Sequence, residues 1–128
     1  MPITPTPKIW MNGELVDWDK AQVHVLTHKL HYGTGVFEGI RAYETPRGPA
    51  IFRLDAHIRR LYDSAKIYRM TPEITPDEVR QASCDVLTRN GLKSAYIRPI
   101  IARGNCGLGV VPKDMNVVET AILVAPWG

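Results

Sequence analysis

The chain has 128 residues, of which 45% are hydrophobic and 23% charged, a composition that is ordinary for one globular domain with a buried core. Its net charge is +3, but the Lys and Arg residues are scattered, with no run of like charges and no basic stripe among aromatic residues, so we expect no nucleic-acid binding. No apolar run approaches the roughly 18 residues of a membrane helix, and the lack of a signal-peptide pattern predicts a cytoplasmic protein with reduced cysteines.

The first predicted element follows a Pro- and Thr-rich segment. We expect residues 1–8 to be a flexible tail and residues 9–128 to form the domain. Asn12-Gly13 stands between two short strand-like runs. Because both positions of a two-residue hairpin turn favour positive φ, this dipeptide predicts a β-hairpin.

The next part of the chain alternates strand-like runs with breaks. Residues 23–25 could form a strand and residues 27–32 a short helix, which two glycines then interrupt. A strand is expected over 36–43 and its return strand over 50–53, on either side of a turn rich in proline and glycine.

Two helices are expected after this second hairpin. The first begins at the N-cap Asp55 and continues to about Arg69. Its apolar residues follow the spacing of one buried helix face: Ile58, Leu61, Tyr62, Ala65 and Tyr68. The second begins at the N-cap Thr75, with Pro76 and two acidic residues in its first turn, and ends at Asn90-Gly91. Its predicted core face consists of Val79, Ala82, Val86 and Leu87.

Two further strands complete the predicted fold. They span residues 94–102 and 117–125, and a glycine-containing loop at 104–112 lies between them. Hairpins followed by two helices and two more strands predict an α+β fold, with an antiparallel sheet and the helices packed on one side.

The strand expected over 94–102 carries a candidate carboxylate site. Its alternation points Tyr96 and Arg98 the same way, about 7 Å apart. A phenol hydroxyl and a guanidinium placed side by side can hold a carboxylate. The alternative is an amphipathic strand whose outer face carries an exposed arginine, which is the commoner outcome of such spacing. Pro99 has no backbone N–H to donate to a neighbouring strand, which indicates a position at the sheet edge or at an interruption of the pairing.

A second candidate group lies on the strand expected over 36–43. Phe37, Gly39 and Arg41 share one face, where the glycine either admits a ligand close to the backbone or marks a bulge or close packing. Glu38 lies on the opposite face, where a carboxylate needs a partner, and we expect a structural hydrogen bond rather than a catalytic role.

The remaining polar candidates are a histidine group and one arginine. His24, His28 and His31 have i, i+4, i+7 spacing, but the segment is not convincingly helical and no other ligand completes a zinc site, so we expect no metal. Arg60 points away from the apolar face of its helix. That placement suits either a solvated arginine or one that binds a phosphate oxygen.

Four segments, in the same order along the chain, closely resemble the branched-chain amino-acid aminotransferases. They are LHYGTGVFEGIR at 30–41, HIRRL with DSAK within 57–66, AYIRP at 95–99 and APWG at 125–128. The resemblance extends over essentially the whole chain from Ile9. It implies the small N-terminal α+β domain of a pyridoxal 5′-phosphate (PLP) enzyme of fold type IV, whose large domain follows and whose subunits form a homo-oligomer.

The resemblance also assigns site residues. Arg60 matches the arginine that binds the cofactor phosphate. Residues that match the substrate pocket are Phe37, Gly39, Tyr96, Arg98 and Trp127, with Tyr32 and Val110 reaching in from a neighbouring subunit. The implied reaction exchanges an amino group between leucine, isoleucine or valine and 2-oxoglutarate, so that glutamate and 2-oxo acids also bind. Tyr96 suits the α-carboxylate and Arg98 the side-chain carboxylate of glutamate.

The Schiff-base lysine of this family belongs to the large domain, and the lysines of this chain match no catalytic position. We therefore expect the 128-residue chain to be inactive by itself. Two alternatives stay open. One is a non-catalytic ligand-binding or interaction module of the same fold, and the other is a relative such as a D-amino-acid aminotransferase or an aminodeoxychorismate lyase.

Overall fold

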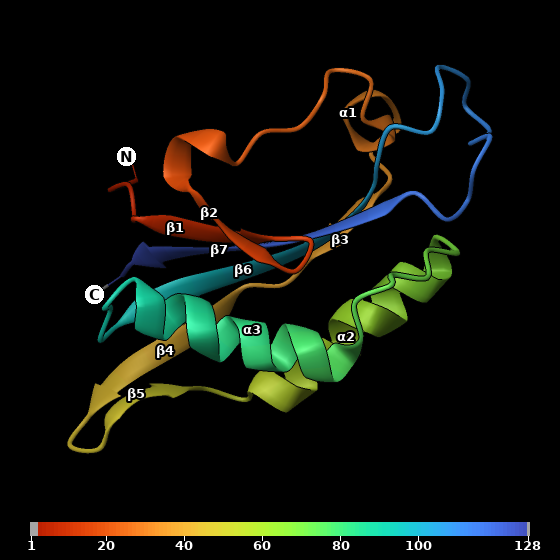
Figure 1. Cartoon of the computed structure of the whole chain (residues 1–128). Coiled ribbons are helices and arrows are strands. Elements are labelled where there is room, and N and C mark those ends of the chain that lie inside the picture. The colour runs from red at the N-terminus through yellow and green to blue at the C-terminus, as the bar shows by residue number, and fades with distance from the viewer. Residues whose placement is uncertain (1–2, 128) are drawn as a thin grey trace.

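The computed structural model describes residues 3–127, and within this range seven strands form one antiparallel sheet (Figure 1). Met1, Pro2 and Gly128 lie outside the described residues, and with them the ends of the predicted tail and of the APWG segment. In spatial order the strands are β2 (Glu14–Asp17), β1 (Lys8–Met11), β7 (Val118–Pro126), β6 (Ala95–Arg103), β4 (Ile40–Thr45) and β5 (Gly48–Ile51), with β3 (Gly35–Phe37) also paired to β6.

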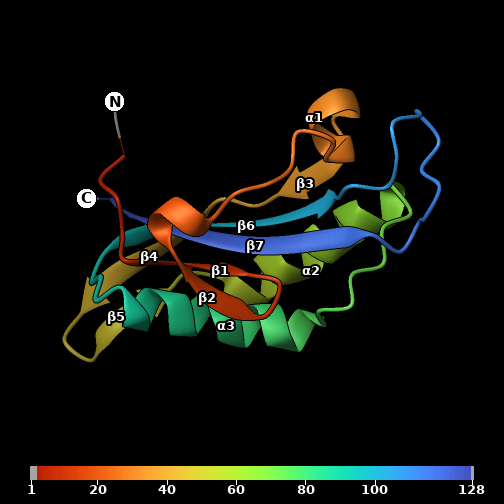
Figure 2. The same cartoon turned by 45° about the horizontal axis from the view of Figure 1, so that its top comes forward.

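Two long helices, α2 (Leu54–Ile67) and α3 (Pro76–Arg89), cover one face of this sheet (Figure 2). The core between helices and sheet is built from fully buried aliphatic side chains, among them Leu61, Val79, Val86, Ile97 and Ile122. The predicted α+β fold, with an antiparallel sheet and helices packed on one side, is confirmed. The short helix α1 (His28–Tyr32) lies near β3 on the other side of the sheet, and a 3₁₀ turn (Trp18–Lys20) follows β2.

The N-terminal hairpin forms as predicted. Asn12 and Gly13 have φ of 51° and 100°, the positive values that a tight turn between β1 and β2 requires. Asn12 also ties the hairpin to β7, because its backbone N–H donates to Thr120 O and its side-chain oxygen accepts from Thr120 N, both at 2.8 Å. Within the predicted tail, Thr6 is buried and Lys8 begins β1, while the division at residue 8 stays a prediction.

The predicted caps of the two long helices have opposite outcomes. The prediction that Thr75 caps α3 and that Pro76 opens the helix is confirmed, and the structure adds a capping box between Thr75 and Glu78. The prediction that Asp55 caps α2 is wrong. The helix begins at Leu54 directly after Arg53, whose φ of 54° makes a sharp left-handed turn out of β5, and Asp55 lies inside the first turn. Tyr68 is 44% exposed rather than buried, because the helix has already ended before it.

Three predicted strands differ from the structure. The return strand expected over 50–53 is β5 at Gly48–Ile51, and residues 52 and 53 form the turn before α2. Residues 23–25 form no strand; instead the chain turns there, with Thr27 N donating to His24 O at 2.9 Å. The strand expected over 36–43 is divided into β3 and β4, although both halves keep one register on β6. Pro99 lies opposite Glu38 and has no N–H, so only the bond from Glu38 N to Pro99 O, at 3.2 Å, spans the break. Pro99 therefore marks an interruption, not an edge.

Two smaller features concern the cysteines and the length of the helices. Cys84 and Cys106 are both unpaired, as predicted. Among residues 3–127, no helix combines the length and apolar character that crossing a bilayer would require.

Candidate active site

The face of the sheet that the long helices leave open carries most of the predicted pocket residues. Along β6 the residues buried against the helices alternate with half-buried ones, and Tyr96 and Arg98 belong to the second set. The β4–β6 register places Arg41 directly beside Tyr96. Phe37 pairs with Ile100 in the same register, so Phe37 and Gly39 also lie on this open face. The predicted side-chain alternation on both strands is confirmed.

Arg98 is held between two aromatic rings instead of extending into solvent. Its guanidinium carbon lies 4.6 Å from the ring centre of Phe37 and 5.2 Å from that of Tyr96. One Nη2–H donates to the Tyr96 hydroxyl at 2.9 Å. The Nε–H is buried and donates to no atom of residues 3–127. This arrangement fits the predicted carboxylate site better than the alternative of a solvated arginine, because the guanidinium is fixed in direction and retains unused donors.

Trp127 closes the other end of this group. Its ring centre is 5.5 Å from that of Tyr96, and the Arg41 guanidinium lies 5.9 Å from it. A hollow of about 210 Å³ opens here, lined by Ile3, Tyr96, Arg98, Leu123, Ala125 and Trp127. Leu123 and Ala125 were not predicted from the sequence. Their signal is the β6–β7 register, which pairs them with Arg98 and Tyr96, and a register cannot be read from two strands separated by a long loop.

Gly39 is required by the aromatic ring above it. A Cβ placed at residue 39 would collide with the hydroxyl of Tyr96. We expect Gly39→Ala to displace this ring and to lower the free energy of unfolding by about 1–3 kcal/mol, the usual cost of overpacking. Urea unfolding measures this change. Gly109→Ala is the control, since the nearest atom to its added carbon is Val111 O at 3.7 Å. Equal stability of the two variants would contradict the close packing.

On the helix side of the same strand break, Glu38 binds two residues of α2. Its side chain is only 6% exposed. Arg60 donates from Nε to Oε2 at 2.9 Å and from Nη2 to Oε1 at 2.8 Å, and His57 Nδ1 lies 2.8 Å from Oε1. The prediction that Glu38 needs a structural hydrogen-bond partner is confirmed. That the partner is Arg60 was not predicted, because the two residues are far apart in the sequence.

Within this cluster, Glu38 and Arg60 each stabilise the charged form of the other. Burial alone would raise the pKa of the Glu38 carboxyl, but the hydrogen bonds from Arg60 and His57 outweigh it and hold that pKa below its usual value. The hydrogen bond to Glu38 in turn raises the pKa of Arg60. Glu38 is therefore a carboxylate at neutral pH. Because a carboxylate only accepts hydrogen bonds, His57 carries its proton on Nδ1.

Arg60 also borders open space. Its side chain is 69% exposed, and together with Arg53, Ala56 and His57 it lines a hollow of about 280 Å³ beside the first turns of α2. Glu38 uses the Nε–Nη2 side of the guanidinium, so both Nη1–H groups and one Nη2–H remain available. The four lining residues include two arginines and one histidine but no carboxylate, a donor set suited to a phosphate.

Tyr32 and Val110 lie apart from the other predicted pocket residues. The Tyr32 hydroxyl donates to Leu108 O at 2.9 Å, and His28 Nε2 lies 2.8 Å from Val110 O. These bonds join α1 to the loop after β6, at the end of the sheet far from both chain termini (Figure 1). Both residues are substantially exposed, at 41% and 67%. The structure therefore gathers five of the seven predicted pocket residues and leaves these two on a separate projection.

The three histidines considered as metal ligands have unrelated partners. His28 Nδ1 lies 2.7 Å from Thr34 Oγ1, His31 Nε2 lies 2.8 Å from Val25 O, and His24 Nδ1 accepts from Leu26 N at 3.0 Å. In the part of the chain that the structure describes, no three His, Cys, Asp or Glu side chains are grouped to hold a metal ion.

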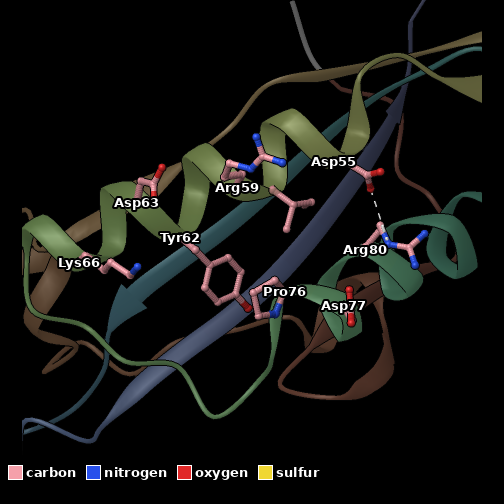
Figure 3. A pocket seen from close by; sticks show the side chains of 9 residues that line it. Asp55, Arg59, Tyr62, Asp63, Lys66, Pro76, Asp77 and Arg80 are labelled. Atoms are coloured by element: carbon pink, nitrogen blue, oxygen red, sulfur yellow. Dashed lines mark ion pairs between the residues drawn. The ribbon is translucent and has the colours of Figure 1, made fainter.

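A wider hollow of about 630 Å³ lies between α2 and α3, away from this site (Figure 3). Its acidic and basic residues alternate, and Asp55 and Arg80 form an ion pair at 3.6 Å. The charged lining residues are Asp55, Arg59, Asp63, Lys66, Asp77 and Arg80. Three carboxylates balance three cations in this wider hollow. It therefore has no excess positive charge to attract a phosphate, in contrast to the hollow at Arg60.

Known proteins match both the sequence and the fold. The family model described as amino-transferase class IV matches residues 35–127. The branched-chain-amino-acid aminotransferase of Escherichia coli K12 is 51% identical over 120 residues, which is 94% of this chain and 39% of that protein. Two structures of the T.th. branched-chain amino acid aminotransferase also match. The matched region is 95% of this chain in one comparison and 96% in the other, and it is 41% of the T.th. chain in both. The complex with 4-methylvaleric acid has 49% identity and a TM-score of 0.92, and the complex with N-(5′-phosphopyridoxyl)-L-glutamate has 50% and 0.93. The chain thus spans about two fifths of these proteins.

Proposed function

The chain belongs to the amino-transferase class IV family, and we propose that residues 9–128 are the small N-terminal domain of a PLP-dependent branched-chain amino-acid aminotransferase. The observation that carries this proposal is 51% identity over 120 residues with an enzyme of that name. The complete enzyme would transfer the amino group of leucine, isoleucine or valine to 2-oxoglutarate. It would lie in the cytoplasm, where the unpaired Cys84 and Cys106 would stay reduced.

The residues of this chain fit the cofactor at its phosphate end. When bound, PLP supplies the electron sink for amino-group exchange, and a lysine of the large domain would be its covalent partner. Arg60 would hold the phosphate with the N–H groups that Glu38 leaves free. The T.th. relative has been solved with a phosphopyridoxyl adduct of glutamate and with a branched carboxylic acid, which supports an enzyme that accepts both substrate classes.

The open-face group would recognise the substrates. Tyr96 would donate its hydroxyl to the α-carboxylate that all substrates share. Phe37 and Trp127 would contact the branched side chain, because burying its methyl groups against aromatic rings is favourable by about 0.8 kcal/mol per methylene. Arg98 would bind the side-chain carboxylate of glutamate or 2-oxoglutarate in the same space.

A neighbouring subunit would complete the pocket. Tyr32 and Val110 lie on the projection formed by α1 and the loop after β6, held together by the hydrogen bonds of Tyr32 and His28. Their exposure leaves them available to a second copy of the enzyme, so we propose a homo-oligomer in which each projection reaches the pocket of its neighbour.

Transamination by the full-length protein that contains this chain tests the proposal. With PLP, L-leucine and 2-oxoglutarate, we expect glutamate to form, and the 128-residue chain alone should give no turnover. D-alanine is the comparison substrate. A preference for D-alanine over L-leucine would instead favour a D-amino-acid aminotransferase. Ligand binding without any turnover by the full-length protein would favour a non-catalytic module.

A further inference from the structure

Glu38 has no part in the proposed function, yet it accepts every hydrogen bond that orients the Arg60 guanidinium within residues 3–127. The carboxylate is 6% exposed, whereas the arginine that it binds is 69% exposed. An exposed arginine ordinarily samples many rotamers, and fixing one before a ligand arrives reduces the entropy that binding costs. The buried partner therefore determines where the exposed cation points.

We propose that Glu38 is a positioning residue that holds Arg60 in the orientation that receives the cofactor phosphate. The proposal rests on the proposed function, since it concerns the same phosphate site. It assigns no contact between Glu38 and the cofactor. Glu38 acts through Arg60, with His57 as the second donor that keeps the carboxylate in place.

The geometry allows Arg60 to serve carboxylate and phosphate together. A guanidinium offers two forks, one from Nε and one Nη atom and one from the two Nη atoms. Glu38 occupies the first fork, with distances of 2.9 and 2.8 Å. The second fork stays free at the hollow that Arg60 lines with Arg53 and His57. The two anions therefore bind different sides of one planar group and do not compete for the same N–H groups.

The position of Glu38 in the chain links the two halves of the site. It lies at the break between β3 and β4, where its N–H donates to Pro99 O, next to Arg98. Its neighbours Phe37 and Gly39 lie on the open face of the sheet beside Arg98 and Tyr96, while its own side chain points to the helix side. One short segment thus anchors the phosphate arginine on one face and shapes the substrate pocket on the other.

The test uses Glu38→Gln in the full-length protein and compares PLP with pyridoxal, which lacks the phosphate. Glutamine keeps the size of the side chain but cannot accept at both positions. We expect the dissociation constant for PLP to rise at least about tenfold, as for one lost charge-assisted hydrogen bond, and that for pyridoxal to stay unchanged. Glu44→Gln, at an exposed position of β4, is the matched control. Equal weakening of both ligands would overturn the proposal, because a merely structural role would affect both.

Two further variants separate positioning from folding and from competition. Glu38→Asp keeps the charge but shortens the reach, so it should also weaken PLP selectively; wild-type affinity would overturn the proposal. In an Arg60→Ala background, Glu38→Gln should have no additional effect on PLP binding, because the residue it positions is gone. Tighter PLP binding by Glu38→Gln would mean that the carboxylate competes with the phosphate, and would also overturn it. If the wild-type protein itself binds no PLP, the proposed function fails instead.

Discussion

Replacing Arg60 with alanine in the full-length protein is expected to weaken PLP binding about 100-fold, the equivalent of roughly 3 kcal/mol. The variant removes the free fork that faces the hollow beside α2, and with it two charge-assisted hydrogen bonds to a dianionic phosphate. Titration of PLP followed by its absorbance measures the dissociation constant. With saturating PLP, much of the turnover should return, because the phosphate anchor takes no part in the chemistry at the reacting carbon.

The control for this variant must account for Glu38. Without Arg60, the buried carboxylate keeps His57 as its only partner among the described residues, so Arg60→Ala should also lower the melting temperature. Arg60→Lys keeps the charge but not the fork, and should fall between wild type and alanine. The adjacent Arg59 is exposed and lines the wider hollow of Figure 3 instead. Arg59→Ala should therefore leave PLP affinity unchanged. PLP binding by Arg60→Ala as tight as in the wild type would rule out this phosphate site.

Local signals in the sequence predicted local structure well. The Asn12-Gly13 hairpin and the Thr75 cap each depend on a few adjacent residues whose preferences agree. Asp55 failed as a cap because the turn that precedes α2 is set by the path of the chain out of β5, where Arg53 takes the left-handed conformation. The N-cap preference of a single residue type cannot predict the path of the chain before the helix.

Longer-range features depended on register and on pairing across the fold. The alternation of Tyr96 and Arg98 was predictable because it follows from one strand. The contribution of Leu123 to the same hollow was not, since it needs the register of β7 on β6. Likewise, Arg60 resembled a solvated arginine as long as its partner was unknown. Only the packing of α2 against the break at Glu38 brings their side chains together.

Arg98→Met is expected to separate the two substrate classes. Methionine keeps a long side chain between Phe37 and Tyr96 but cannot bind a carboxylate, so kcat/KM for 2-oxoglutarate should fall about 30–100-fold, as for the loss of a paired charge. The value for L-leucine should change little, because its apolar side chain makes no ion pair with Arg98. Steady-state kinetics of both half-reactions measure the difference.

Tyr96→Phe is the matched comparison on the same strand face. It removes only the hydroxyl that Arg98 contacts at 2.9 Å, and the α-carboxylate that it would bind is common to all substrates. Both substrates should therefore lose about tenfold in kcat/KM, with their ratio unchanged. The contrast between the two variants distinguishes the role of Arg98 from that of Tyr96. A general disturbance of the pocket would lower kcat/KM for both substrates in both variants. An equal loss for leucine and 2-oxoglutarate in Arg98→Met would mean that the guanidinium, stacked as it is between two rings, only supports Tyr96 and does not distinguish an acidic side chain from a branched one.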